Sequence, residues 1–159
     1  KEAIGHLEEI SNGECSKNDL LHRSSKLSKI NLRRIQQSIP GGTWEDWDDE
    51  LLLPCHKKDS GKGYKSVYGR MSWDEPSPTI TTQFYGYGNG RFGHPTQNRA
   101  LSLREGAILQ SFPENYDFSL EFGEYNMKKI GTHIGNAVPV KLAEAIGQSI
   151  INHLIDVEK

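Results

Sequence analysis

A chain of 159 residues is the size of one domain, or of one small domain with part of another, so it buries only a modest core. The formal net charge of −2 and the calculated pI near 6.3 exclude a uniformly basic surface, so contact with a polyanion has to come from local patches. Cys15 and Cys55 lie in dissimilar contexts, and no apolar run approaches the roughly 20 residues of a membrane span. We therefore expect a reducing, intracellular setting. The start at Lys1, without an initiating methionine, is the start expected of a piece of a longer protein.

The first part of the chain predicts loops and one well-marked helix. Residues 1–25 are polar and interrupted by glycine and serine, so we expect an entry segment of loop with a short helix at 2–10. A second helix is expected to begin after Ser28, its N-cap, and to end before Pro40.

The middle of the chain predicts a loop followed by two strands. Residues 43–63 are expected to form an extended loop whose tryptophans attach it to a core. Residues 64–73 and 78–87 have strand character, the second with β-branched and aromatic enrichment. The glycines of 86–93 then predict a flexible loop.

Two helices are expected in the last third. Ser102 and Glu105 match a capping box, so a short helix should run from Leu103 until Phe112-Pro113 ends it. A long helix is predicted at 139–156, and the Gly135-Asn136 turn is expected to form its N-terminus. Its apolar residues repeat along one stripe, which we expect to be partly exposed because the sheet that would cover it is not fully supplied by this chain. Such exposure favours self-association of the chain by itself.

Three motifs occur in a fixed order along the sequence. The first joins Gly69-Arg70 to Thr79-Ile80-Thr81-Thr82, the second comprises Arg99, Arg104, Glu105 and Phe112-Pro113, and the third is the segment 130–140. Together they resemble the C-terminal part of a DNA (cytosine-5)-methyltransferase, namely its target-recognition domain and its ninth and tenth motifs. The resemblance covers roughly residues 20–157.

The resemblance implies an α+β fold in three parts. After the entry segment at 1–25, residues 26–98 would form a small mixed recognition domain with few strands and long loops. Residues 99–159 would supply C-terminal helices of a Rossmann-like, S-adenosylmethionine-dependent methyltransferase domain. The missing N-terminal catalytic half of the same chain would be a partner of this part.

The resemblance also implies roles for particular residues. Asn136 and Val138 would line the S-adenosylmethionine pocket, the first with a donor and an acceptor and the second as an apolar wall. Arg99, Arg104 and Glu105 would organise the recognition domain by cross-linking carbonyls and loop donors, although Ile108 stands where many members have another arginine. Contacts to double-stranded DNA would come from Arg70, Thr79, Ile80, Thr81, Thr82, Gln83 and Arg91.

The chemistry implied by the family belongs to the full-length enzyme. That enzyme would flip a cytosine out of the duplex, attack C6 with a cysteine thiolate and methylate C5. The Pro54-Cys55 dipeptide lies in the wrong order and context for this nucleophile, so we predict no catalytic residue here and no activity of this part alone. The histidines and cysteines show no paired zinc-ligand spacing, so no metal is expected. The resemblance further implies a cytoplasmic, nucleoid-associated enzyme of a bacterial restriction-modification system.

Two other interpretations remain open from the sequence. The chain is alternatively a stand-alone DNA-binding module without methylation, in which Asn136 and Val138 serve only as a helix cap and the recognition strands carry the whole function. It is alternatively a protein-interaction domain, an interpretation favoured by the acidic tryptophan loop at 44–50.

Overall fold

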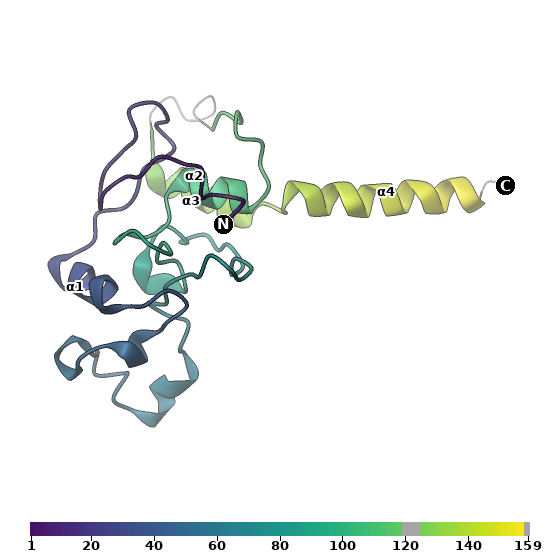
Figure 1. The fold of residues 1–159 in the computed structure, drawn as a ribbon. Coiled ribbons are helices and arrows are strands. Elements are labelled where there is room, and N and C mark those ends of the chain that lie inside the picture. Colours follow the sequence, from purple (N-terminus) through teal and green to yellow (C-terminus); the bar gives the residue numbers. More distant parts are fainter. Residues whose placement is uncertain (119–124, 158–159) are drawn as a thin grey trace.

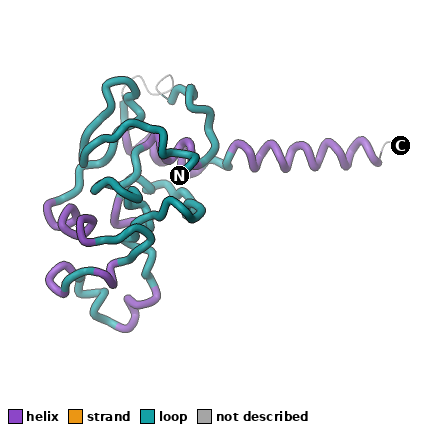
Figure 2. Tube along the Cα trace, viewed as in Figure 1, coloured by secondary structure: helices purple, strands orange, loops and turns teal. Residues whose placement is uncertain are grey.

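The computed structural model describes residues 1–118 and 125–157, which form helices joined by long loops (Figures 1 and 2). The α-helices in these ranges are α1 (Lys29–Gln37), α2 (Leu103–Leu109), α3 (Met127–Asn136) and α4 (Val140–Val157). Short 3-10 helices lie at η1 (Trp44–Asp46), η2 (Asp49–Leu51), η3 (Asp59–Gly63) and η4 (Tyr87–Asn89). Within the described ranges, no helix is both long enough and apolar enough to cross a membrane.

The two strands predicted at 64–73 and 78–87 are absent from the described structure. The only ladder-like pairings found there are isolated bridges, Cys15 with Arg23, Arg70 with Gly93 and Gly93 with Ala100. Residues 78–81 run without regular structure and 82–85 form turns, because Pro76 and Pro78 remove donors. The two strand placements are therefore wrong, and the described fold is mostly helical, with the β part of the predicted α+β class reduced to these bridges. The short helix predicted at 2–10 is also wrong, since residues 2–6 form turns.

Helix ends marked by local capping chemistry are where the sequence predicts them. Ser28 accepts a hydrogen bond from the Asn31 amide, and α1 ends at Gln37, ahead of Pro40. Both bonds of the capping box at Ser102 and Glu105 are present at the start of α2. These two helix starts confirm the sequence prediction.

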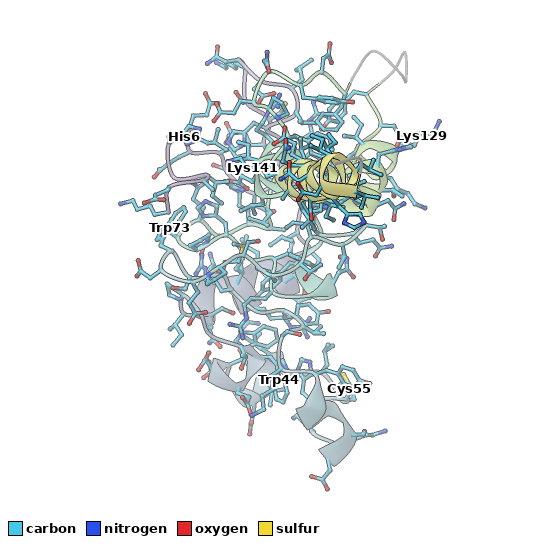
Figure 3. The ribbon with its side chains drawn as sticks, turned by 90° about the vertical axis from the view of Figure 1, so that its right-hand side faces the viewer. His6, Trp44, Cys55, Trp73, Lys129 and Lys141 are labelled. Atoms are coloured by element: carbon cyan, nitrogen blue, oxygen red, sulfur yellow. The ribbon has the colours of Figure 1, made fainter. Side chains whose placement is uncertain are left out.

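Two apolar clusters hold the molecule together. The upper cluster joins the loop residue Phe84 to Leu103 of α2 and to Ile130 and Ile134 of α3. The lower cluster gathers Ile35 of α1 with Trp44 and Trp47 of the loop that follows and with Tyr87 of η4. The two tryptophans are buried, so the prediction that they attach this loop to a core is confirmed. Figure 3 places Trp44 and Cys55 low in the molecule, far from Lys129 and Lys141.

Helix α3 was not predicted, and it changes the interpretation of the Gly135-Asn136 pair. The pair closes α3 instead of opening the last helix, and Ala137 is the C-cap residue, with its amide donating to His133 O at 3.1 Å. The last helix, α4, begins at Val140, directly after Pro139. Helix α3 packs against α2, whereas α4 extends away from the body of the molecule (Figure 1).

The apolar stripe of α4 is exposed, as predicted. No residue of the helix is buried, and its apolar side chains retain half or more of their surface, namely Leu142, Ile146, Ile150, Ile151, Leu154, Ile155 and Val157. Contiguous apolar surface of this extent rarely remains bare in water.

We therefore predict that the 159-residue chain self-associates through α4. Its weight-average mass in light scattering should rise with concentration, and Ile150→Glu with Leu154→Glu should give a monomer, because charges on the stripe cannot be buried unpaired. Glu144→Gln, on the same exposed helix, is the matched control and should leave the mass unchanged. A wild-type chain that stays monomeric at all concentrations would contradict the prediction.

Candidate functional site

An open pocket of about 470 Å³ lies between the proline-threonine segment and the glycine loop. Five of its polar lining residues are Ser72, Glu75, Thr79, Asn89 and Arg91. The pocket therefore combines hydroxyl, amide, carboxylate and guanidinium groups on a surface open to solvent.

The threonine segment presents only some of its predicted contact residues. Thr79, Thr81 and Gln83 are exposed and Thr82 is half-buried. Ile80 is buried in the upper cluster, so its side chain faces the core and not a ligand. The Ile80 side chain therefore has little surface left for the DNA contact that the sequence predicts.

Arg70, predicted to contact DNA, is buried inside the protein. Its Nε donates to His94 O at 2.8 Å, and Nη1 donates to Ser38 O at 2.9 Å. Nη2 donates to Gln97 O at 2.8 Å and to Asn98 Oδ1 at 3.0 Å. Because these donors are occupied by neighbouring parts of the fold, the structure gives Arg70 a structural role and leaves it few donors for the DNA contact that the sequence predicts.

Arg91 is placed differently from Arg70. Its side chain is 31% exposed, and its Nη1 lies 3.9 Å from Glu75 Oε2, which is an ion-pair distance beyond that of a hydrogen bond. Its stem lies on Gly69, where an added Cβ would come within 2.9 Å of Arg91 Cγ. The guanidinium is thus held at the pocket wall with donors that a ligand can use.

The end of α3 lies directly against the threonine segment. A Cβ on Gly135 would overlap the Thr81 carbonyl and the Thr82 nitrogen, so only glycine allows the two backbones to lie this close. The close approach that Gly135 permits here is therefore an approach to protein backbone. Asn136 and Val138, which follow it, are exposed, and Val138 keeps 59% of its surface.

Gln110, which the sequence did not single out, fixes this end of α3. Its Nε2 donates to Ile134 O at 3.0 Å and to Ala137 O at 3.1 Å, and the side chain is buried. These bonds satisfy carbonyls at the end of the helix and tie α3 to α2. A lone glutamine near a helix end carries no sequence signal for such a role.

A buried ion pair organises the start of α2. The fully buried Arg99 donates to both carboxylate oxygens of Glu105 at 2.7 Å, and its Nε donates to Ile10 O at 3.1 Å. Burial by itself raises the pKa of Glu105, but the hydrogen bonds and charge of Arg99 outweigh it and hold the pKa below its ordinary value. The predicted cross-linking of carbonyls by this arginine is present.

Arg104 ties the same helix to the entry segment. Its Nε donates to Asp19 Oδ2 at 2.6 Å, and its Nη1 donates to Glu114 O at 2.7 Å. Ile108, the position at which the resemblance expects another arginine, packs on the upper cluster instead. The departure at this position therefore replaces a polar contact with an apolar one.

His94 lies beside the ion pair and escaped the sequence analysis because an isolated loop histidine carries no motif. Its Nε2 lies 3.5 Å from Glu105 Oε1, and its Nδ1 accepts from the Gln97 amide at 2.9 Å. Burial lowers the pKa of His94 from 6.5 to about 4, although the carboxylate of Glu105 opposes the shift.

We predict that His94 makes the fold sensitive to mild acid. Between pH 6.5 and about 4 the unfolded chain binds a proton that the folded chain excludes, so stability falls as the pH is lowered, by up to about 3 kcal/mol. Urea unfolding across this range should show a shallower pH dependence for His94→Gln, and the same dependence as wild type for His6→Gln, whose histidine is exposed. Equal slopes for wild type and His94→Gln would contradict the assignment.

Comparison with known proteins gives one consistent answer. The model of the C-5 cytosine-specific DNA methylase family matches residues 1–152. The type II methylase M.HgiDII of Herpetosiphon aurantiacus is 56% identical over 150 residues, which cover 94% of this chain and 42% of the relative. The type II methyltransferase M.Sau96I of Staphylococcus aureus is 39% identical over 77% of this chain and 28% of the relative. DNA (cytosine-5)-methyltransferase 3 of Arabidopsis thaliana is 34% identical over 94% of this chain and 12% of the relative.

The chain therefore spans less than half the length of each of these relatives. The family match nevertheless includes the entry segment, the open pocket lined by Glu75 and Arg91 (hereafter the groove), the buried ion pair and the end of α3. On this match, the chain belongs to the C-5 cytosine-specific DNA methylase family.

Proposed function

We propose that this chain is the C-terminal, target-recognising part of a DNA (cytosine-5)-methyltransferase and supplies one wall of its S-adenosylmethionine pocket. The observation that carries the proposal is the backbone contact between Gly135 and Thr81. It brings an exposed threonine segment, suited to DNA, beside an exposed Asn136 and Val138, suited to a cofactor. One rigid contact thus joins the two functions that such an enzyme must align.

The DNA surface in this proposal is smaller than the sequence predicted. It consists of the exposed or half-exposed residues Thr79, Thr81, Thr82, Gln83 and Arg91. Hydroxyl groups bind phosphate oxygens, while amide and guanidinium groups read base edges in the major groove of double-stranded DNA. Arg70 and Ile80 act from inside the protein, by holding the loops that carry this surface.

Asn136 and Val138 fit a cofactor wall because neither is used by the fold. Asn136 is exposed at the end of α3, and Val138 is exposed in the link to α4. An amide with a donor and an acceptor, next to an apolar side chain, suits a ligand that has both polar and apolar parts. When bound, S-adenosylmethionine would supply the methyl group, and this chain would bind and orient it with no catalytic residue of its own.

The proposal also divides the chain into a DNA-recognition part and a part of the catalytic domain. Residues 26–98 would recognise DNA and 99–159 would belong to the catalytic domain, with Arg99, Arg104 and Glu105 holding the two in register. Arg99 and Glu105 are suited to this role because their pair is buried between the loop at 92–100 and α2. The exposed stripe of α4 would pack on the N-terminal catalytic half, since a solvated apolar helix is unfavourable.

The test measures methyl transfer from tritiated S-adenosylmethionine to DNA with the full-length protein and with this chain alone. The full-length protein should methylate cytosine, and Asn136→Ala should raise the KM for S-adenosylmethionine while leaving DNA affinity unchanged. This chain alone should show no turnover, and turnover above a no-protein control would contradict the division of labour. An unchanged KM in the variant would mean that Asn136 only ends a helix and does not line the cofactor pocket. A full-length protein that binds DNA without methylating it would favour the DNA-binding module.

A further inference from the structure

We infer that Glu75 and Arg91 act together to read one G·C base pair of the target in the major groove. The inference deepens the proposed function, because it rests on DNA lying along the groove that these two residues line. It assigns a specificity role to Glu75, whose carboxylate would otherwise oppose DNA binding.

The two side chains lie close to each other at the groove but do not form a hydrogen bond with each other. Arg91 Nη1 and Glu75 Oε2 are 3.9 Å apart, so their charges attract while hydrogen-bonding capacity remains on both. Glu75 is 65% exposed and Arg91 is 31% exposed. A base edge that enters the groove thus meets a donor and an acceptor side by side.

Arg91 is also the pre-positioned member of the pair. Its Cβ and Cγ lie on Gly69, where an added Cβ would come within 3.1 and 2.9 Å of them. A stem fixed in this way lowers the conformational entropy that the guanidinium loses on binding. The other well-placed arginines have different tasks, since the guanidinium groups of Arg34, Arg70, Arg99 and Arg104 donate to carbonyls or carboxylates of the fold.

The chemistry of the pair matches one base pair better than the others. Across the major-groove edge, a G·C pair presents two acceptors on guanine, N7 and O6, followed by the N4 donor of cytosine. Arg91 donates to the two acceptors and Glu75 accepts from the donor. An A·T pair alternates acceptor, donor and acceptor, so it leaves the guanidinium with one partner fewer.

Glu75 further separates a base edge from the backbone. A phosphate offers acceptors alone, so it repels the Glu75 carboxylate and leaves its lone pairs unpaired. The exposed Asp74 next to it adds to this repulsion. The pair therefore disfavours non-specific DNA and favours a correctly placed G·C pair.

The inference is tested by selecting binding sites from a randomised DNA pool with the full-length protein, its Arg91→Ala and Glu75→Ala variants, and the control Arg33→Ala. Arg33 belongs to an exposed ion pair with Glu50, outside the groove. Wild type and control should select the same site. Arg91→Ala should lose the preference for G·C at one position of that site, by roughly tenfold or more. Glu75→Ala removes the acceptor, so it should relax the same position and strengthen binding to unselected DNA.

Base analogues at that position supply a second readout that does not depend on variant folding. Replacing guanine by 7-deazaguanine should weaken wild type and leave Arg91→Ala unchanged, because N7 is removed. Replacing cytosine by N4-methylcytosine, which keeps the hydrogen of the base pair and loses the one in the major groove, should weaken wild type more than Glu75→Ala. If every preferred position stays the same in both variants, the inference is overturned while the proposed function stands. If the wild-type protein selects no sequence, the proposed function itself fails.

Discussion

Replacing Arg99 by alanine is expected to lower the free energy of unfolding by about 3–5 kcal/mol. The change leaves Glu105, which is 1% exposed, as an uncompensated charge in the core, and it also removes the bond to Ile10 O. Urea unfolding at neutral pH measures the loss. This is the largest stability effect that we expect of a single side chain here.

The exposed pair of Arg33 and Glu50 is the matched control for Arg99. Arg33→Ala also removes an arginine from a carboxylate, but water solvates the remaining charge, so about 0–1 kcal/mol is expected. Replacing Arg99 and Glu105 together by Met and Leu should cost less than Arg99→Ala alone, because no charge is then left buried. A loss below 1 kcal/mol for Arg99→Ala would show that water reaches Glu105.

Gly135→Ala is expected to reduce kcat/KM for DNA methylation by about a hundredfold in the full-length protein. The new methyl group overlaps the Thr81 carbonyl, so the two backbones must separate, and displacements near 1 Å at an aligned site have effects of this size. The free energy of unfolding should fall by only about 1–3 kcal/mol, as for other overpacked sites.

Gly63→Ala is the control for this glycine. A Cβ at Gly63 meets nothing within 4 Å, and Gly63 lies outside the surfaces proposed for DNA, cofactor and the catalytic half, so the change should leave methylation unaltered. Initial rates at saturating and limiting DNA separate the two variants. Full activity of Gly135→Ala would mean that the contact between α3 and the threonine segment does not align the site.

Local chemistry accounts for the parts of the fold that the sequence predicts well. The starts of α1 and α2 depend on side chains within three residues of the helix, so Ser28 and Ser102 are sufficient to locate them. The exposure of α4 was predictable for a similar reason, because an amphipathic stripe needs a partner surface.

Non-local packing explains the errors. Helix α3 contains Gly131 and Gly135, which usually mark turns, but here they admit the Tyr85 ring and the Thr81 backbone from elsewhere in the chain. The strand propensity of 78–87 finds no pairing partner among residues 1–118 and 125–157, so this segment forms loops and turns.

The same contrast between local chemistry and non-local packing separates the exposed site residues from the buried ones. Exposed polar residues such as Thr79 and Arg91 lie on the groove as their types indicated. Arg70 has the same charge as Arg91 but is enclosed by carbonyls of Ile35, Ser38, His94 and Gln97, which no local pattern reveals. The sequence shows which side chains are charged, whereas their exposure to solvent depends on loops that are distant in the sequence.

The entry segment bears on how specificities can be exchanged between such proteins. Arg99 bonds to Ile10 O, Arg104 to Asp19, and His22 lies 2.9 Å from Ser102 Oγ, so the first 25 residues are anchored on α2 and the loop before it. A chimaera that exchanges residues 1–98 would bring foreign partners to all three anchors. Transplants of a recognition module should therefore exchange residues 26–98 and leave residues 1–25 with their own α2, or inherit a misfolded junction in place of a new target sequence.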